Sequence, residues 1–325
     1  MSLLNQLNAT TTYYWLNTDP VDIVSKASPL LWKLMGNAVS RDNWEIKNHE
    51  TVDGGLMIKV PLEYANSNSG VYGKDTVINQ SKKDIIDAAR FRWAGVYGSN
   101  TINLDDKTQN SGEEAIIALT KQYMASIKKA ARIKMAQDVI AAAATTDSIN
   151  GLGDLFNTTT STEYGSIDTD EMADWAASVV TTAEDISFEV LQKIFRTPAM
   201  GDFADYRPDF CVTTQILLDG YERSLHPQQR YKDSKAVEAG WDNITHKGAT
   251  IVADTYVTAG YFYALNLRFL ELRAHKDYNF TTPVWVTKEV LGQPDTMTAN
   301  TRWRGNLLCK NRKLQVLHTN LTEPT

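Results

Sequence analysis

Cysteine is almost missing from this chain. Cys211 and Cys309 are its only two cysteines, and they lie far apart in different sequence contexts. Two isolated cysteines predict small, buried, reduced thiols rather than a disulfide framework or a metal pair. Histidine is also sparse, and none of the five histidines has a second His or Cys at metal-ligand spacing. We therefore expect no metal and no cofactor.

The familiar catalytic motifs are missing as well. The chain contains no G-x-S-x-G, no H-E-x-x-H and no Walker loop. A G-x-G at 151–153 follows a predicted helix rather than a strand, so it does not indicate a dinucleotide loop. His226 fits a helix C-terminus better than a catalytic base. Asp254 could form a carboxylate pair with Asp219 or Glu222, although an Asp at a strand end more commonly starts a turn. We expect no catalytic residue.

An excess of positive charge and long apolar runs are also lacking. The formal net charge is −6, which argues against tight nucleic-acid binding by the chain as a whole, because phosphate binding needs clustered Lys and Arg. No stretch approaches the roughly 18 apolar residues of a membrane helix, and residues 1–7 do not read as a secretory signal. With 42% hydrophobic residues, the chain can still bury a substantial core.

What the sequence does contain is a long strand-like arm. Apolar and polar residues alternate from Leu56 to Tyr64 and again over 89–93, which is the period of a half-buried strand. Residues 65–73 between them predict a flexible polar tip. We expect a two-stranded arm over 56–104. An isolated hairpin is marginal in water, and nothing adjacent in sequence covers its apolar faces, so we expect it to be completed by a neighbouring copy.

One long helix is predicted directly after the arm, over 111–145. Ser111 and Glu114 form a capping box at its start. An apolar stripe follows at steps of three or four residues, at Ile116, Leu119, Tyr123, Ile127, Ala131, Met135 and Val139. The cations Lys121, Lys128 and Arg132 gather on the opposite face. A solvated helix face is the commoner explanation of such a cluster, and an inner surface that contacts nucleic acid is the alternative.

Shorter elements fill the rest of the chain and indicate an α+β fold. We expect short helices within 25–35, 168–184 and 187–197, the last capped by Ser187. Trp303 should pack inward between two arginines that pair with acids, because neighbouring strand residues face opposite sides. Strands are expected at 210–213, 248–253, 261–266, 269–274, 284–287, 305–310 and 313–317, with a helix through 217–221.

Seven short sequence blocks in the second half occur in an order that resembles the major capsid proteins of tailed bacteriophages with the Hong-Kong-97-type fold. Each block is weakly specific alone, and the ordered series covers about residues 187–317. The blocks are PDFCVTT (208–214), PQQRY (227–231), AGWDNI (239–244), KGATIVAD (247–254), YALN (263–266), LELRAH (270–275) and GNLLCKNR (305–312).

The resemblance implies how the chain is divided. Its first half agrees with the architecture of that family, which has an arm, a loop, a spine helix and two domains. The implied parts are an N-terminal arm (1–50), an extended loop (51–109), a spine helix (110–147), a peripheral domain (148–186 with 279–325) and an axial domain (187–278).

The resemblance also implies a structural role without catalytic activity. Such subunits assemble as pentamers and hexamers into an icosahedral shell around a double-stranded DNA genome, and they are made in the host cytoplasm. The implied partners are further copies of the chain, a separate scaffolding protein, a portal and non-specifically bound DNA, with decoration proteins left open and no membrane. The loop tip that would contact a neighbouring subunit comprises Asn66, Ser69, Val71, Tyr72 and Lys74.

Two departures from the family pattern and two rival functions remain. The chain begins directly with a candidate arm, so we expect a separate scaffolding protein rather than a cleaved N-terminal segment. Lys74, Lys82 and Lys83 lie where some relatives form a cross-link, but no partner Asn can be named, and we expect none. The rivals are an encapsulin-like nanocompartment shell with the same fold and a soluble α/β enzyme with a concave pocket.

Overall fold

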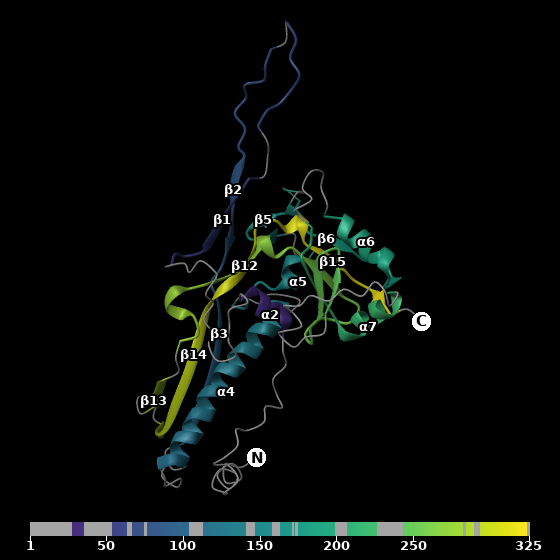
Figure 1. Ribbon diagram of the computed structural model, residues 1–325. Helices are drawn as coiled ribbons and strands as arrows, with labels where there is room; N and C mark the ends of the chain where they lie inside the picture. The colour runs from purple at the N-terminus through teal and green to yellow at the C-terminus, as the bar shows by residue number, and fades with distance from the viewer. Residues whose placement is uncertain are drawn as a thin grey trace.

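A computed structural model describes most of the chain, and Figure 1 shows it as an elongated molecule. An arm projects at one end, and a long helix extends with paired strands to the other. In the part of the chain described, no helix is both long and apolar enough to cross a membrane. The described residues are 28–35, 54–63, 67–74, 77–103, 113–140, 147–157, 163–170, 172, 175–198, 207–225, 243–281, 284–288 and 293–323.

A four-stranded antiparallel sheet is built around one 17-residue strand, β14 (Gln293–Cys309). β3 (Ala94–Asn103) pairs along one edge of β14. β13 (Val284–Lys288) and β12 (Leu270–Ala274) share the other edge. The strand predicted at 305–310 is therefore only the end of a much longer one.

The long helix α4 (Glu113–Ile140) lies along β3 and β14 in Figure 1. Ile127, Ala131, Met135 and Val139 are buried and Tyr123 is half-buried, which confirms the predicted apolar stripe from Ile127 onward. Ser111 and the side chains of the first helical turns lie outside the described residues. Burial of this stripe, rather than helix propensity, supplies most of the stability of such a helix.

A six-stranded mixed sheet forms the second half of the body. Its central strands are apolar on both faces because both faces are covered. Cys211 and Ile251 join one apolar cluster under α6 and α7, while Val212 and Val252 face the main core. The strand order is β6 (Ser178–Val180), β15 (Val316–His318), β11 (Phe262–Leu265), β8 (Phe210–Thr213), β10 (Ala249–Ala253) and β9 (Asn243–His246).

Two helices pack against the first of these clusters. α6 (Phe188–Arg196) begins where predicted, and the Ser187 hydroxyl accepts a hydrogen bond from the Val190 amide at 3.3 Å. α7 (Gln215–Ser224) follows β8 directly and contains the predicted helix. Both predicted buried cysteines are confirmed as free, buried thiols.

The helix predicted over 168–184 is wrong. That segment begins in β5 (Ile167–Asp168), paired with β4 (Glu163–Tyr164), and continues through β6 to β7 (Glu184–Asp185). β6 pairs with β15, and β7 pairs with β16 (Leu321–Thr322), so strands near the C-terminus override the local helical pattern. These pairings also add β6 and β15, from the proposed peripheral segments, to the sheet of the proposed axial domain.

A short helix, α2 (Pro29–Leu34), anchors the N-terminal region in the main core. Leu30, Leu31 and Leu34 are buried there. The Ser28 hydroxyl donates to the Asp254 carboxylate at 2.5 Å and caps the helix. The remaining elements are α5 (Leu152–Leu155) and three 3-10 turns, η4 (Leu267–Phe269), η5 (Lys276–Tyr278) and η7 (Arg312–Leu314).

Candidate functional site

The base of the arm is a regular antiparallel hairpin of β1 (Ile58–Glu63) and β2 (Ile86–Phe91). Ile58 lies opposite Phe91, and Val60 lies opposite Ala89, so the four apolar side chains share one face. All four are buried, as the alternation predicted. Leu56 departs from that prediction, because it precedes the strand and its side chain is 91% exposed.

The apolar face at this base is covered by the same chain. The Arg90 amide donates to the Gly165 carbonyl at 2.7 Å, and the Phe91 and Tyr164 ring centroids lie 5.2 Å apart. Gly165 has φ +63°, and a Cβ there would lie 2.9 Å from Phe91 Cζ, so only glycine permits this approach. The expectation that another copy covers the arm was therefore wrong for its base.

The predicted extent of the two-stranded arm also needs correction. β3 does not continue the hairpin, because it turns away and pairs with β14. The Trp93 indole N–H donates to the Gly55 carbonyl at 2.8 Å and ties the two ends of the hairpin together. The hairpin pairing therefore covers 58–91, whereas the prediction extended to 104.

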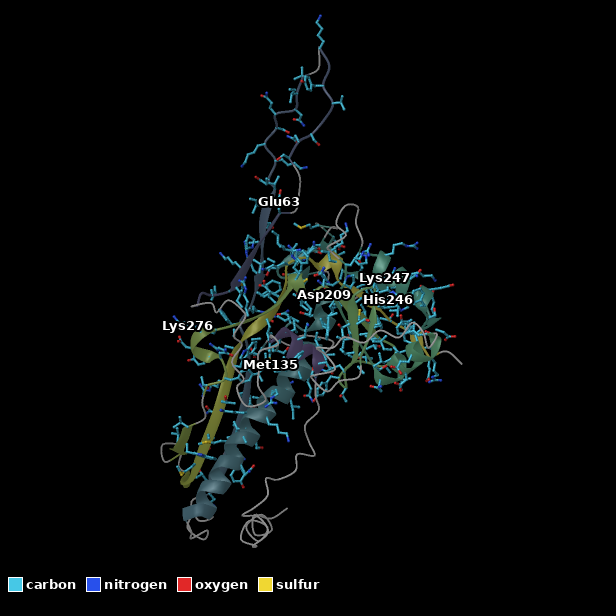
Figure 2. The ribbon with its side chains drawn as sticks, viewed as in Figure 1. Glu63, Met135, Asp209, His246, Lys247 and Lys276 are labelled. Carbon is cyan, nitrogen blue, oxygen red and sulfur yellow. The ribbon has the colours of Figure 1, made fainter. Side chains whose placement is uncertain are left out.

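The distal part of the arm projects from the body beyond Glu63 (Figure 2). Four of the predicted tip residues, Ser69, Val71, Tyr72 and Lys74, are exposed there, and Asn66 lies outside the described residues. The Asn68 side-chain amide donates to the Ser81 carbonyl at 2.6 Å across the arm. This contact joins the outgoing and returning chains although neither forms a strand.

Sequence reasoning missed several apolar residues on the same arm. Val77 is 93% exposed, and Ile78 and Ile86 are also exposed. They lie in the returning segment, whose polar neighbours mask any alternation. An exposed apolar cluster of this kind marks a surface for association.

A second group of exposed apolar residues, on a face of the four-stranded sheet that we call the outer sheet face, was also missed. Tyr97, Val284 and Val286 are all exposed. Gly98 faces α4, since a Cβ there would meet the Ile127 carbonyl oxygen, and Tyr97 must therefore face away from the helix. Val284 and Val286 lie on that same side through their register with β14. The available signal in the sequence was the alternation Val284-Trp285-Val286, in which the structure leaves both valines exposed and Trp285 half-buried.

The predicted basic patch on α4 is only partly described. Lys128 is exposed on the helix and Arg132 is half-buried, while the Lys121 side chain lies outside the described residues. Further along, Lys134 donates to Asp138 at 2.6 Å, which adds an ion pair rather than free positive charge. The described part of the patch therefore carries modest positive charge.

The carboxylates considered for catalysis have other partners. Asp254 accepts hydrogen bonds from Ser28 and from the Tyr256 amide, and burial raises the pKa of its carboxyl group. Asp219 accepts from the Gln215 side chain at 2.8 Å. The turn favoured for Asp254 is therefore confirmed, and its other hydrogen bond goes to the Ser28 cap of α2 rather than to Asp219. No group of three or more potential metal ligands occurs among the residues with described positions.

Trp303 packs inward, as predicted. It is buried, and its ring centroid lies 6.5 Å from that of Phe280. Arg304 lies over the Tyr278 ring at 5.8 Å, where the prediction had an acidic partner. A cation over an aromatic face is a weak but favourable contact at such an exposed site.

Comparison with solved structures finds this architecture in capsid proteins. A chain of the cyanophage A-1(L) capsid matches with a TM-score of 0.67 and 14% identity, covering 96% of this chain and 99% of its own. A native GTA particle capsid chain gives 0.56 and 11%, covering 97% and 99%. The capsid of Ralstonia phage GP4 gives 0.55 and 12%, covering 97% and 96%.

These matches establish the fold. They span nearly the full length of both partners, so arm, helix and sheets correspond together. The predicted Hong-Kong-97-type capsid fold is thereby confirmed. No protein-family model and no curated protein matches the sequence.

Proposed function

We propose that this chain is a major capsid subunit of a tailed phage, which self-assembles into the icosahedral head that encloses a double-stranded DNA genome. The full-length capsid fold is the observation that carries the proposal. A structural role without catalysis agrees with it, because Asp254 and Asp219, two of the three carboxylates weighed as catalytic pairs, are engaged in a cap and in a hydrogen bond.

The arm supports assembly through its exposed apolar residues. Val71, Tyr72, Val77 and Ile78 lie on a segment that points away from the body. The outer sheet face, with Val284 and Val286, lies at the opposite end of the molecule (Figure 1). One chain cannot bring the two surfaces together, so the arm of one copy docks on a neighbour. Such a contact joins two different patches, and interfaces of this kind build rings such as pentamers and hexamers when the rotation between copies closes.

The proposed division of labour follows the predicted parts. The spine helix is α4, which carries the four-stranded sheet along the shell. The axial domain, 187–278, contributes α6 and α7, and such domains meet at the capsomer centre. The peripheral domain comprises 148–186 with 279–325. The extended loop covers 51–109, and the N-terminal arm covers 1–50.

The remaining partners are proposed on weaker grounds. Lys128 and Arg132 would contact packaged DNA without sequence specificity, since phosphate contacts carry no base information. Assembly in the host cytoplasm would use a separate scaffolding protein and a portal. Decoration proteins belong to one similar capsid, that of phage G, and are not proposed for this chain.

The decisive experiment removes the arm tip. Deleting residues 65–80 should abolish shells while leaving folded subunits, because the base is held by the chain's own Tyr164 and Gly165. Electron microscopy and sedimentation would be compared with a control in which a Gly/Ser linker of equal length replaces the tip. Normal particles from the deletion would contradict the proposal. Particles that enclose protein instead of nucleic acid would indicate a nanocompartment shell.

A further inference from the structure

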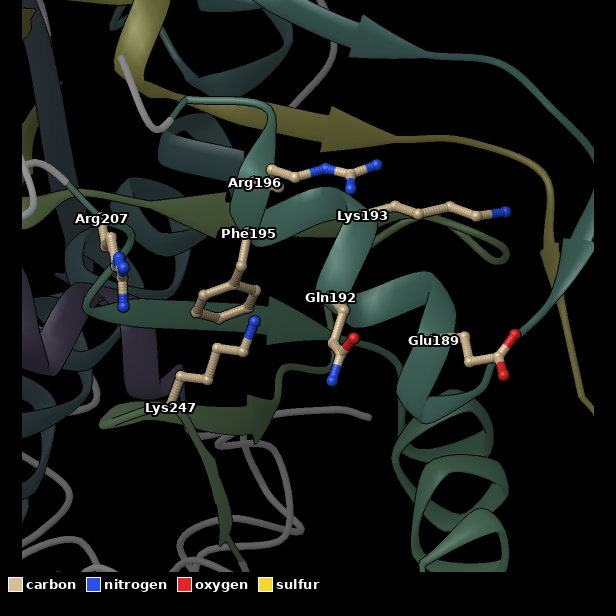
Figure 3. A pocket seen from close by; sticks show the side chains of 7 residues that line it. All are labelled: Glu189, Gln192, Lys193, Phe195, Arg196, Arg207 and Lys247. Atoms are coloured by element: carbon tan, nitrogen blue, oxygen red, sulfur yellow. The ribbon is translucent and has the colours of Figure 1, made fainter. Parts of the chain in front are cut away.

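A pocket of about 560 Å³ opens beside α6, on the body of the molecule and away from the arm, where Figure 2 labels Lys247. Four of its seven lining side chains are cationic and one is acidic (Figure 3). They come from three separate parts of the chain: α6, the segment before β8, and the turn between β9 and β10. The lining residues are Glu189, Gln192, Lys193, Phe195, Arg196, Arg207 and Lys247.

The positive charge of this pocket is not balanced within the part of the chain that is described. Lys193 forms an ion pair with Glu184 at 3.2 Å. Arg196, Arg207 and Lys247 have no such acidic partner among the described residues, and Glu189 offsets only one of these three charges. Counted over the described residues, the lining therefore keeps an excess of about two positive charges, which a bound anion would neutralise.

Lys247 occupies a backbone position that turn chemistry does not explain. It has φ +49° and is followed by Gly248 at φ +88°, in a two-residue turn that joins His246 to Ala249. Two positive φ angles define a type I′ turn, for which Asn-Gly, Asp-Gly or Gly-Gly is preferred. A long side chain gains nothing in this strained position. Because lysine is not favoured by the turn itself, we attribute its presence to its side chain, which lines the pocket.

We propose that this basic pocket binds a phosphate-bearing ligand. Arginine side chains match phosphate oxygens with two parallel hydrogen bonds, and a lysine adds a mobile point charge. A phosphate monoester carries about −1.5 to −2 at pH 7, and two adjacent nucleic-acid phosphates carry about −2 together, so either source matches the excess of positive charge, whereas one carboxylate would leave part of it unbalanced. The source of the phosphate is either nucleic acid or a free small molecule. The proposal does not depend on shell assembly.

The pocket contains its own reporter of occupancy. Phe195 lines it, and the Phe195 ring centroid lies 5.0 Å from that of His246, which precedes Lys247. The His246 Nδ1 shares a hydrogen bond with the Tyr221 hydroxyl at 2.9 Å, and its Nε2 is buried without a partner in the described structure. An anion bound beside Lys247 should shift the His246 ring resonances. His318, in another strand, serves as an internal control.

The test titrates inorganic phosphate into the full-length protein at low ionic strength, by calorimetry and by histidine-ring NMR. Lys247→Asn is the central variant, because Asn suits the turn and should preserve or raise stability. Loss of one charge-assisted contact should weaken phosphate binding about tenfold or more. Lys276→Asn removes an equal charge on a distant part of the molecule (Figure 2) and should leave binding unchanged.

Two further measurements identify the source of the phosphate. A short DNA oligonucleotide that competes with phosphate, and that loses affinity in Lys247→Asn, would assign the site to nucleic acid. Phosphate binding without competition would assign it to a small molecule. The proposal is overturned if phosphate does not bind, or if Lys247→Asn binds it as tightly as the unchanged protein. A variant that only blocks assembly would show that the pocket receives an acidic group from a second copy.

Discussion

At the residue scale, His246 is an imidazole held neutral in β9 of the six-stranded sheet. Its side chain is 3% exposed, and the rings of Phe188 and Phe195 approach it at 5.0 Å each. Burial, and then the charge of Lys247, lowers its pKa from 6.5 to about 4. Protonation would place a charge in an aromatic cage where Nε2 has no described acceptor.

This burial predicts a pH-dependent stability. The unfolded chain binds a proton at His246 below about pH 6.5, whereas the folded chain does so only near pH 4, so stability should fall as the pH drops between these values. The shift corresponds to a loss of about 3 kcal/mol across this window. Urea unfolding from pH 7 to pH 4 would measure it.

A His246→Phe variant provides the control for this prediction. It keeps an aromatic ring in the cage but has no proton to bind, so its pH profile should be flatter by about the same 3 kcal/mol. Burial also raises the pKa of Asp209 and Asp254, which acts in the opposite direction, and the comparison between variants cancels that contribution. Parallel profiles for the two proteins would contradict the assignment.

Single-residue environments were predictable where a local pattern decided them. The Ser187 cap and the inward Trp303 follow from helix-start and strand-alternation rules. The turn after Asp254 also follows from a local rule, since its carboxylate accepts from the Tyr256 amide. Its contact with Ser28 does not, because Ser28 lies 226 residues away in the sequence. The basic pocket was missed for the same reason: Arg207 and Lys247 meet α6 only in the folded chain.

At the scale of elements, the contact between α4 and β3 is unusually close at Gly98. A Cβ at this position would lie 2.2 Å from the Ile127 carbonyl oxygen and 3.2 Å from the Ala131 amide nitrogen. Both are backbone atoms of a helix, so neither can rotate away as a side chain would. The absence of a side chain on the strand therefore sets how closely the helix approaches the sheet.

Gly98→Ala should force α4 and β3 apart. We expect a loss of about 1–3 kcal/mol in the free energy of unfolding, as for other overpacked positions. Denaturant unfolding monitored by circular dichroism would measure it. Gly70→Ala is the matched control, because no atom lies within 4 Å of its added Cβ, and it should change stability by less than about 0.5 kcal/mol. Equal stability of the two variants would show that the helix adjusts without cost.

Long periodic elements were predictable, and short ones depended on distant partners. The stripe of α4 and the amphipathic α6 can be recognised within their own sequence. The 168–184 segment was wrongly predicted as a helix. Its short strands are held by β15 and β16, which come more than 130 residues later, so no local pattern could indicate them. β14 was predicted too short because its first half is stabilised by pairing with β3 and β13.

At the scale of the whole molecule, the chain covers some of its apolar surface itself and leaves other apolar residues exposed. The arm base is closed by Tyr164 and Gly165 of the same chain. The arm tip and the outer sheet face stay exposed at opposite ends. Periodicity could indicate that the apolar face of the arm needs a partner, but it could not tell whether the same chain or another copy provides it. The proposed division of the chain into domains came only from resemblance to a known fold.

If the two exposed surfaces meet between copies, polar substitutions on either one should weaken assembly alike. Val284→Thr with Val286→Thr keeps strand propensity and leaves the core intact, since both side chains face away from α4. Burying a valine side chain contributes about 1.5–3 kcal/mol, so the concentration needed for assembly should rise at least about tenfold. Light scattering would follow assembly, and the same pair changed to Ile should assemble normally.

Adding Val77→Thr on the arm tests whether the two surfaces meet each other. It should raise the concentration needed for assembly by a smaller factor in the doubly substituted protein than in the unchanged protein, because the partner surface is already polar. Equal factors in the two proteins would place the arm's docking surface elsewhere.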